Sequence, residues 1–258
     1  MSKQDYEVRL TEFLTRDVSP RAQKPALIIL NQPIADVEIL SRLWDHTSYH
    51  LCADGGANQL YDLLKAKETT PASRFLPSII HGDLDSLRDD VRDFYDKQGV
   101  LISQDPDQYS TDFGKAIRQV FEAQPSLSDV LVLGTIAGRV DQGIGLLGEM
   151  HREQHSTRHP SLVLWLFSES SISFILKKGK TKIHTPLQEG VITRNVGILP
   201  VYGPAHVTTQ GLEWDVEDWY TSMGGQMSTS NHIVRDEVFI TTDAEVLFTV
   251  ERNHEVSG

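Results

Sequence analysis

Two aspartates at an i, i+2 spacing, Asp83 and Asp85, closely follow a short apolar run at residues 78–80. In an extended chain this spacing puts both side chains on one face. Neighbouring carboxylates repel each other, and Mg²⁺ removes that repulsion because it binds through one or two carboxylates together with phosphate oxygens and water. The pair therefore indicates a magnesium site that serves a phosphate compound. A helix-capping turn is the alternative, because aspartate and serine favour such turns.

A second aspartate-rich loop, residues 105–112, lies between the next apolar run and the next amphipathic segment. Asp112 falls in the first turn of the predicted helix, where the helix dipole favours negative charge, so capping is an alternative here too. Lys115 follows about one helical turn later and could reach a phosphate.

A third loop, residues 134–142, carries Arg139 and Asp141. Arginine offers a planar fork of donors that matches phosphate. Asp141 could orient that arginine, bind a metal indirectly or take a proton from the substrate. Capping explains one such loop easily, but three of them at successive strand ends favour a single shared site.

Alternating strand-like and helix-like segments position these loops. The predicted strands lie at residues 26–30, 49–53, 78–80, 100–102, 130–133 and 162–167. Between them apolar residues recur at helical spacing, and a capping box of Ser86 and Asp89 predicts where one helix begins. Such repeated units predict an α/β domain with a mostly parallel sheet and helices on both faces, which binds ligands at the carboxyl ends of its strands.

The pattern changes after about residue 168. Short β-rich stretches follow, punctuated by glycine and proline, and none of them has a sustained helical period. We therefore expect a C-terminal all-β sandwich or partial barrel, and we divide the chain into residues 1–168 and 169–258.

A pair of histidines, His151 and His155, is spaced like two ligands of a zinc protease. Glu153 between them is not next to the first histidine, as that motif requires. The pair therefore predicts a solvated helix end.

The composition is that of an acidic globular chain, with 258 residues, 39% of them hydrophobic, and a formal net charge of −12. Nucleic acid and anionic membranes are therefore not expected as partners, and a site for a polyanion such as ATP needs local cations. The single cysteine, Cys52, fits a reducing compartment. Apolar runs too short for a bilayer and an N-terminal stretch without a secretory core predict a cytoplasmic location.

In chain order, five short motifs resemble those of the thiamine pyrophosphokinase family. They are ADGGAN at 53–58, GDLDS at 82–86, DQYSTDF at 107–113, GRVDQ at 138–142 and STSN at 228–231. Residues 30–32, LNQ, resemble the fungal branch of that family. The resemblance runs from about residue 26 to 250, and the shared order of the motifs makes it specific.

The resemblance implies transfer of pyrophosphate from ATP to the hydroxyl of thiamine, with Mg²⁺ as cofactor. It also implies a homodimer in which each α/β domain faces the β-sandwich of its partner, so that thiamine binds at the subunit interface. The implied metal ligands are Asp83, Asp85 and Asp112, which are catalytic together with Arg139 and Asp141. The implied ATP contacts are Asp54, Gly55, Gly56, Gln108, Thr111, Lys115, Arg139 and Gln142, and the implied thiamine contacts are Ser228, Thr229, Ser230 and Asn231.

Two features depart from the family pattern. Val140 replaces an aromatic residue in the arginine motif, and we expect it to face the core. Residues 142–159 form a longer stretch than expected, with room for an extra helical turn, and its relation to the site is open.

The expected reaction is in-line attack of the thiamine hydroxyl on the β-phosphorus of ATP, with AMP as the leaving group. Such transfers depend on positioning and charge neutralisation. The proton acceptor is open between Asp141, Asp112 and water. Trp214 or Trp219 could stack on the cationic thiazolium, although a place in the β-domain core is the alternative for each.

Two other functions also suit an Asp-x-Asp pair at a strand end. One is a magnesium-dependent nucleotide phosphohydrolase, which would use water as the acceptor. The other is a non-catalytic nucleotide-sensing module, which would bind ATP without consuming it. Neither accounts for the STSN segment at 228–231.

Overall fold

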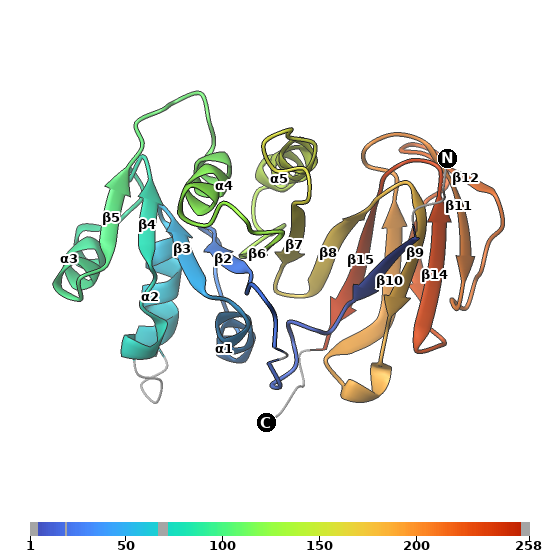
Figure 1. Cartoon of the computed structure of the whole chain (residues 1–258), viewed down its shortest axis with the longest axis horizontal. Coiled ribbons are helices and arrows are strands. Elements are labelled where there is room, and N and C mark those ends of the chain that lie inside the picture. Colours follow the sequence, from blue (N-terminus) through green and yellow to red (C-terminus); the bar gives the residue numbers. More distant parts are fainter. Residues whose placement is uncertain (1–4, 19, 67–71, 254–258) are drawn as a thin grey trace. The chain divides into compact units, whose positions relative to one another are not determined.

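The computed structural model describes residues 5–18, 20–66 and 72–253. They divide into two compact units (Figure 1). Those within Pro20–Glu169 form the α/β unit, and those within Met1–Ser19 and Ser170–Gly258 form the β unit.

The α/β unit is built on a parallel sheet with the strand order β7-β6-β2-β3-β4-β5. The strands are β2 (Ala26–Ile29), β3 (Tyr49–Ala53), β4 (Ile79–Gly82), β5 (Leu101–Gln104), β6 (Asp129–Leu133) and β7 (Val163–Phe167). β2 and β4 are buried along their whole length, as expected for apolar strands covered on both faces. The chain proceeds outward from β2 to β5 and then returns to β6 on the other side of β2. This creates a topological switch point between β2 and β6, where open α/β sheets bind ligands.

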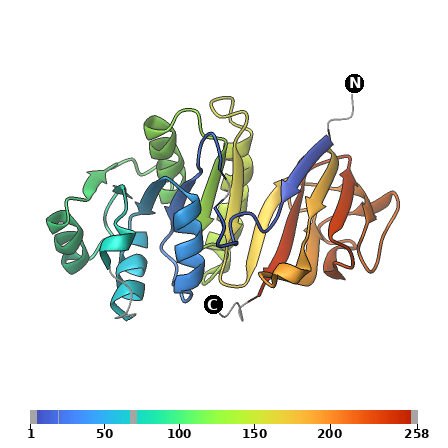
Figure 2. The same cartoon turned by 60° about the horizontal axis from the view of Figure 1, so that its bottom comes forward.

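The described helices of this unit pack on both faces of the sheet. They are α1 (Val37–His46), α2 (Gly56–Ala66), α3 (Asp89–Lys97), α4 (Asp112–Ala123) and α5 (Val140–Gln154), with a 3-10 turn, η1, at Ala72–Phe75. Helices α1 and α2 lie on one side, and α4 and α5 lie on the other (Figures 1 and 2). None of the helices in the described residues combines the length and the apolar character needed to cross a bilayer.

The start of α3 differs from the prediction. The helix begins at Asp89, and Arg88 before it makes no capping bond with its side chain. Ser86 instead donates its hydroxyl to Asp85 at 3.0 Å and its backbone N–H to Asp54 at 3.1 Å. The predicted capping box is therefore wrong, because Ser86 lies two residues before the N-cap and its backbone N–H is bonded to Asp54 and not to Asp89.

The β unit contains two sheets of mainly antiparallel strands. The first has the order β1-β9-β14-β11-β12, and the second includes β13-β10-β15-β8. The strands are β1 (Asp5–Arg9), β8 (Ser171–Leu176), β9 (Gly179–His184), β10 (Ile192–Leu199), β11 (Ala205–Gln210), β12 (Trp219–Thr221), β13 (Ser228–His232), β14 (Glu237–Thr242) and β15 (Val246–Arg252), with a 3-10 turn, η2, at Leu187–Glu189. Buried and more exposed residues alternate along β14 and β11, as in sheets that pack by one face. The predicted fold class, an α/β domain followed by a β-sandwich, is confirmed.

One strand of the β unit comes from the N-terminal part of the chain. β1 pairs in parallel with β9, from Asp5 opposite Lys180 to Arg9 opposite His184. The structure therefore groups residues 5–18 with the β unit, whereas the division into 1–168 and 169–258 put them in the α/β domain. No residue of β1 is fully buried, so its sequence lacks the apolar signal of a core strand.

Candidate active site

Three carboxylates from different elements meet at the carboxyl end of the parallel sheet. Asp54 follows β3, Asp83 follows β4, and Asp112 begins α4. One oxygen of each lies within 4.8 Å of the other two. We call these three residues the acidic cluster. It joins two predicted metal ligands with Asp54, which the motifs had indicated only as an ATP contact.

The backbone around Asp54 is tightly constrained. Its φ of 43° lies in the left-handed region, which aspartate tolerates better than most residues other than glycine. A Cβ on Gly55 would lie 2.3 Å from Nδ2 of Asn31. A Cβ on Gly56 would lie 2.2 Å from the carbonyl oxygen of Ile29. The two glycines therefore let the chain turn from β3 into α2 directly against the end of β2.

Burial and mutual repulsion perturb the acidic cluster. Burial, with added repulsion from Asp83 and Asp54, raises the pKa of Asp112 to about 6. Burial also raises the pKa of Asp54, although the backbone N–H of Ser86 opposes that shift. Oδ1 of Asp54 is buried and has no hydrogen-bond partner within the described part of the chain. An unpaired buried oxygen of this kind costs free energy unless a ligand satisfies it.

The cluster fits a hard divalent cation. Mg²⁺ prefers oxygen ligands, and here three carboxylates converge with one buried oxygen left unsatisfied. A cation would also offset the burial and the mutual repulsion that together raise the two pKa values. The donors therefore suit the magnesium ion that the sequence indicates.

Lys115 of α4 lies against two members of the cluster. Its side chain is 1% exposed, and its Nζ lies 3.3 Å from Oδ2 of Asp83 and 3.9 Å from Oδ1 of Asp112. The ammonium group is thus directed toward carboxylates. Its predicted contact with a phosphate stays a prediction.

Asp85 lies outside the acidic cluster. Leu84 has a φ of 66°, so the chain turns between Asp83 and Asp85 and is not extended as the i, i+2 argument assumed. Asp85 is exposed and accepts the hydroxyl of Ser86 at 3.0 Å. It still contributes to the raised pKa of Asp112. Its role as a metal ligand stays a prediction.

Asn58 of α2 holds the loop that follows β4. Its side chain is 7% exposed, donates from Nδ2 to the Ser86 carbonyl at 2.7 Å and accepts the Arg88 backbone N–H at 3.1 Å. The Arg88 guanidinium also makes two 2.7 Å bonds to exposed Asp62 of the same helix. Helix α2 therefore fixes the loop that carries Asp83 through one buried contact and one exposed contact.

Arg139 and Asp141 form a bidentate ion pair at the start of α5. Nη2 of Arg139 lies 2.5 Å from Oδ2 of Asp141, and Nε lies 3.1 Å from Oδ1. These bonds raise the pKa of Arg139 and lower that of Asp141. This contact fits the first of the three roles that the sequence left open, in which Asp141 orients Arg139, and that role stays a prediction.

Val140, between these two residues, is 75% exposed. The expectation that it faces the core is wrong. It is the first residue of α5, and the buried face of that helix begins only at Leu146.

A cavity of about 440 Å³ opens beside the switch point. Its lining includes Asn31 and Gln32 after β2, Gly134 after β6, Thr111 and Asp112 at the start of α4, and Asp141, Gln142 and Glu149 of α5. Two predicted ATP contacts, Thr111 and Gln142, thus share one cavity with Asp112. Gln108 is exposed in the preceding loop and lies outside that lining.

Three polar residues of this cavity were not predicted as contacts. Gln32 donates to Oε1 of Gln142 at 3.3 Å, and Asn31 accepts from Gln59 at 2.9 Å. Glu149 accepts the hydroxyl of Thr111 at 2.5 Å. The sequence signal that could have identified two of them is the polar pair Asn31 and Gln32, which lies just after the buried strand β2 at the switch point. Glu149 shows that the long stretch 142–159 reaches the cavity.

The β unit has a separate pocket of about 350 Å³. Its lining includes the predicted thiamine segment, Ser228, Thr229, Ser230 and Asn231, together with Trp214 and Trp219. Asn231 is 7% exposed, and its side chain binds the backbone N–H and carbonyl of Trp214 at 3.1 Å and 2.9 Å. Trp214 itself is 54% exposed, so a place in the core does not explain it.

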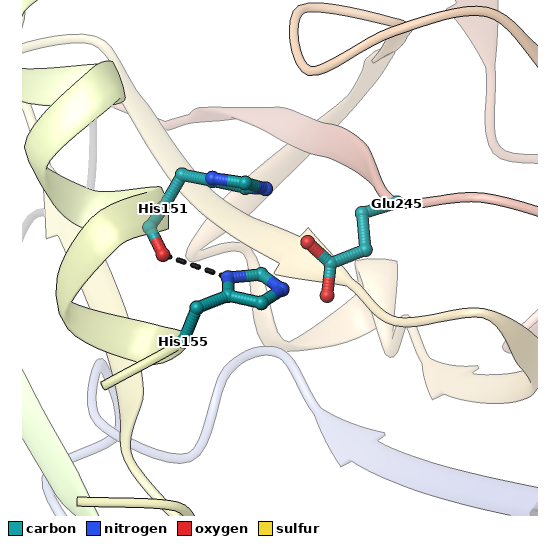
Figure 3. A group of neighbouring side chains, drawn as sticks. All are labelled: His151, His155 and Glu245. Carbon is teal, nitrogen blue, oxygen red and sulfur yellow. Dashed lines mark hydrogen bonds between the residues drawn. The ribbon is translucent and has the colours of Figure 1, made fainter. Parts of the chain in front are cut away.

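The histidine pair lies at the C-terminal end of α5 (Figure 3). Nδ1 of His155 is hydrogen-bonded to the backbone carbonyl of His151 at 2.8 Å, and His155 is exposed. The exposure of His155 agrees with the prediction of a solvated helix end, whereas His151 is only partly exposed.

Two family models match the chain. The model described as thiamin pyrophosphokinase, catalytic domain, matches residues 40–160, all within the α/β unit. The model described as thiamin pyrophosphokinase, vitamin B1 binding domain, matches residues 180–247, all within the β unit. The catalytic match contains the acidic cluster, and the second match contains the STSN segment.

Individual relatives match along most of their length. Thiamine pyrophosphokinase 1 of Arabidopsis thaliana is 32% identical over 97% of this chain and 95% of its own length. The thiamine pyrophosphokinase of Saccharomyces cerevisiae is 31% identical, over 89% of this chain and 86% of its own. The crystal structure of yeast thiamin pyrophosphokinase has a TM-score of 0.85 at 29% identity and covers 96% of this chain and 91% of that one. Thiamin pyrophosphokinase from Candida albicans has a TM-score of 0.81 at 25% identity, covering 96% and 93%.

Proposed function

Because the chain belongs to the thiamine pyrophosphokinase family, we propose that it transfers the pyrophosphate group of ATP to the hydroxyl of thiamine and releases AMP. The observation that carries this proposal is the acidic cluster beside a cavity at the switch point of the sheet. A chain with a net charge of −12 needs such a local arrangement to hold a triphosphate through a cation.

The acidic cluster would hold the Mg²⁺ ion, with Asp85 beside it as a further predicted ligand. A bound Mg²⁺ neutralises phosphate charge and polarises the phosphoryl group. The three carboxylates come from β3, β4 and α4, so the sheet and a packed helix fix their relative positions.

The nucleotide is proposed to occupy the cavity at the switch point. Thr111 and Gln142 line it. The other ATP contacts that the resemblance predicts are Asp54, Gly55, Gly56, Gln108, Lys115 and Arg139. Arg139, oriented by Asp141, would donate to the phosphate oxygens and stabilise the charge that grows on them during transfer. Most of the catalytic effect in this scheme comes from positioning.

The thiamine side is proposed to be the pocket of the β unit. The exposed ring of Trp214 offers a face for the cationic thiazolium, and the segment 228–231 lines the same pocket. The two sides of the reaction thus belong to different units. We propose that a homodimer joins them, with the α/β unit of one chain acting together with the β unit of its partner. A reducing, cytoplasmic location is proposed as well, which the lone buried Cys52 supports.

A single assay tests the proposed function. The purified protein is incubated with ATP, MgCl2 and thiamine, and we expect AMP and thiamine diphosphate in equal amounts. Release of phosphate or pyrophosphate without thiamine would indicate the phosphohydrolase instead. Binding of ATP without turnover would indicate the nucleotide-sensing module. Asp83→Ala serves as the inactive control. It removes the nearer partner of buried Lys115, so we expect a lowered Tm, and a thermal melt must show that the variant is folded at the assay temperature.

A further inference from the structure

We propose that Lys115 is an internal counter-charge that adjusts the acidic cluster to one divalent cation. In this role Lys115 is a positioning residue and makes no contact with the phosphates of ATP. The inference rests on the proposed function, because the cation belongs to that reaction.

The first support is the burial of the side chain. Lys115 is 1% exposed, although lysine is almost never fully buried unless it is paired. Its Nζ donates to Asp83 at 3.3 Å and lies 3.9 Å from Asp112. An isolated ammonium in such a place is strongly unfavourable, so the two carboxylates stabilise Lys115 as much as it stabilises them.

The second support is the charge of the group. Asp54, Asp83 and Asp112 in ionised form carry −3, and the ammonium of Lys115 adds +1, which leaves −2. One Mg²⁺ balances that charge. Asp85 is not counted because it lies outside the cluster and is exposed, so water and salt screen its charge more strongly. Without the lysine, a single divalent cation would leave a net negative charge directly beside a bound triphosphate, which would repel it.

The third support is the position of the ammonium group. It contacts Asp83 and Asp112, whereas the buried Oδ1 of Asp54 has no partner within the described ranges. Lys115 therefore reduces the repulsion without satisfying the oxygen that a cation would bind.

The test compares Lys115→Met, which keeps the length of the side chain, with Lys97→Met, which removes the same charge from the exposed end of α3. Each protein is melted without nucleotide, in EDTA and in excess MgCl2. In EDTA we expect the Tm of Lys115→Met to fall by roughly 5–10 °C, because breaking a buried ion pair leaves uncompensated charge. Excess Mg²⁺ should recover most of that loss. The rise in Tm on adding Mg²⁺ should therefore be larger in Lys115→Met than in the wild type. Lys97→Met should follow the wild type in both buffers.

Besides a Mg²⁺ response equal to that of the wild type, two results would overturn the inference. One is a wild-type Tm for Lys115→Met in EDTA together with a raised KM for ATP, which is the behaviour of a phosphate contact. The other concerns folding. If Lys115→Met does not fold in either buffer, the double variant Lys115→Met/Asp112→Asn restores the charge of −2, since two aspartates remain ionised. Folding of the double variant supports the counter-charge, and its failure shows that packing, not charge, retains the lysine.

These outcomes are separable from failure of the proposed function. If the wild type makes no thiamine diphosphate, the proposed reaction is wrong. If the wild type is active with Mg²⁺ and Lys115→Met nevertheless responds to Mg²⁺ as the wild type does, only the role of Lys115 is wrong.

Discussion

The guanidinium of Arg139 is bonded to a neighbouring side chain, that of Asp141. It is 72% exposed, yet both its Nε and its Nη2 are bonded to Asp141. Lysine cannot reproduce this fork. We expect Arg139→Lys to lower kcat by roughly 10–100-fold, because donors aimed at growing charge are lost. The Tm should not change, because exposed ion pairs contribute little to stability. Steady-state kinetics and a thermal melt measure both effects, and a normal kcat would remove Arg139 from the site.

Asp54 is the cluster member whose role the structure revises most. Asp54→Asn keeps the size of the side chain and an oxygen for the Ser86 N–H, but it removes one charge next to the cation. We expect kcat/KM at low Mg²⁺ to fall on the order of 100-fold, with partial recovery in excess Mg²⁺. Asp62→Asn, at an exposed position of α2, is the matched control and should stay near the wild type. Wild-type activity of Asp54→Asn at low Mg²⁺ would show that the acidic cluster is not the metal site.

Asn58 provides the buried connection between helix α2 and the loop that follows β4. Asn58→Ala leaves the Ser86 carbonyl and the Arg88 N–H unpaired, which should cost about 1–3 kcal/mol of unfolding free energy. If the role of Asn58 were purely structural, this loss of stability would be the only effect of the substitution. We expect in addition a several-fold higher Mg²⁺ requirement, because the loop then holds Asp83 less firmly. Asp62→Ala, which cuts the exposed contact to the same loop, should leave that requirement unchanged, and an unchanged Mg²⁺ requirement in Asn58→Ala would reduce Asn58 to a stability residue.

The packing of α1 against β3 should make stability depend on pH. His50 stacks on Trp44 with ring centroids 3.7 Å apart, and burial lowers its pKa to about 4. The unfolded chain takes up this proton as the pH falls below the usual value of about 6.5, while the folded protein does not until about pH 4. Stability should therefore fall with decreasing pH across that window, by at most about 2 kcal/mol between about pH 7.5 and pH 5.

Urea denaturation of the wild type and His50→Gln at both pH values measures this contribution. In the glutamine variant the loss of unfolding free energy between the two pH values should be smaller by up to about 2 kcal/mol, while buried His81, whose pKa burial also lowers, keeps its own contribution. His155→Gln, at the exposed end of α5, is the control and should retain it. Equal pH dependence in the wild type and His50→Gln would contradict the assignment to His50.

The elements of the α/β unit could be predicted from the sequence because their signals are local. Apolar runs marked the strands, and parallel strands bring their carboxyl ends to one edge, so the meeting of Asp83 and Asp112 could be expected. The turn at Leu84 could not be expected, because it depends on a single left-handed residue, and Asp85 beyond it lies outside the cluster. The place of Asp54 in the cluster depends on a second left-handed residue, Asp54 itself. The pairing of β1 with β9 could not be predicted from the sequence either, because the two strands are far apart in the chain.

At the scale of the whole molecule, the proposed dimer makes a prediction that no monomeric site shares. Asp83→Ala disables the nucleotide side, and Ser230→Trp fills the pocket of the β unit. Each variant alone should be inactive. Co-expression of the two should restore about a quarter of the wild-type activity, because half of the dimers are mixed and each mixed dimer has one intact site of two.

In the control, each variant is expressed alone at the same total amount, and neither sample should be active. The mixed sample should also contain heterodimers by native mass spectrometry. Heterodimers without activity would place both sides of the reaction within one chain and contradict the shared site.

The pairing of β1 with β9 also bears on synthesis. β1 leaves the ribosome before any part of Pro20–Glu169, but its neighbour in the sheet, Gly179–His184, emerges only after that whole unit. The α/β unit can therefore fold while β1 is still unpaired, before β9 has been synthesised. An N-terminal affinity tag should accordingly disturb the folding of the β unit and leave the α/β unit, which follows β1 directly in the chain, unaffected.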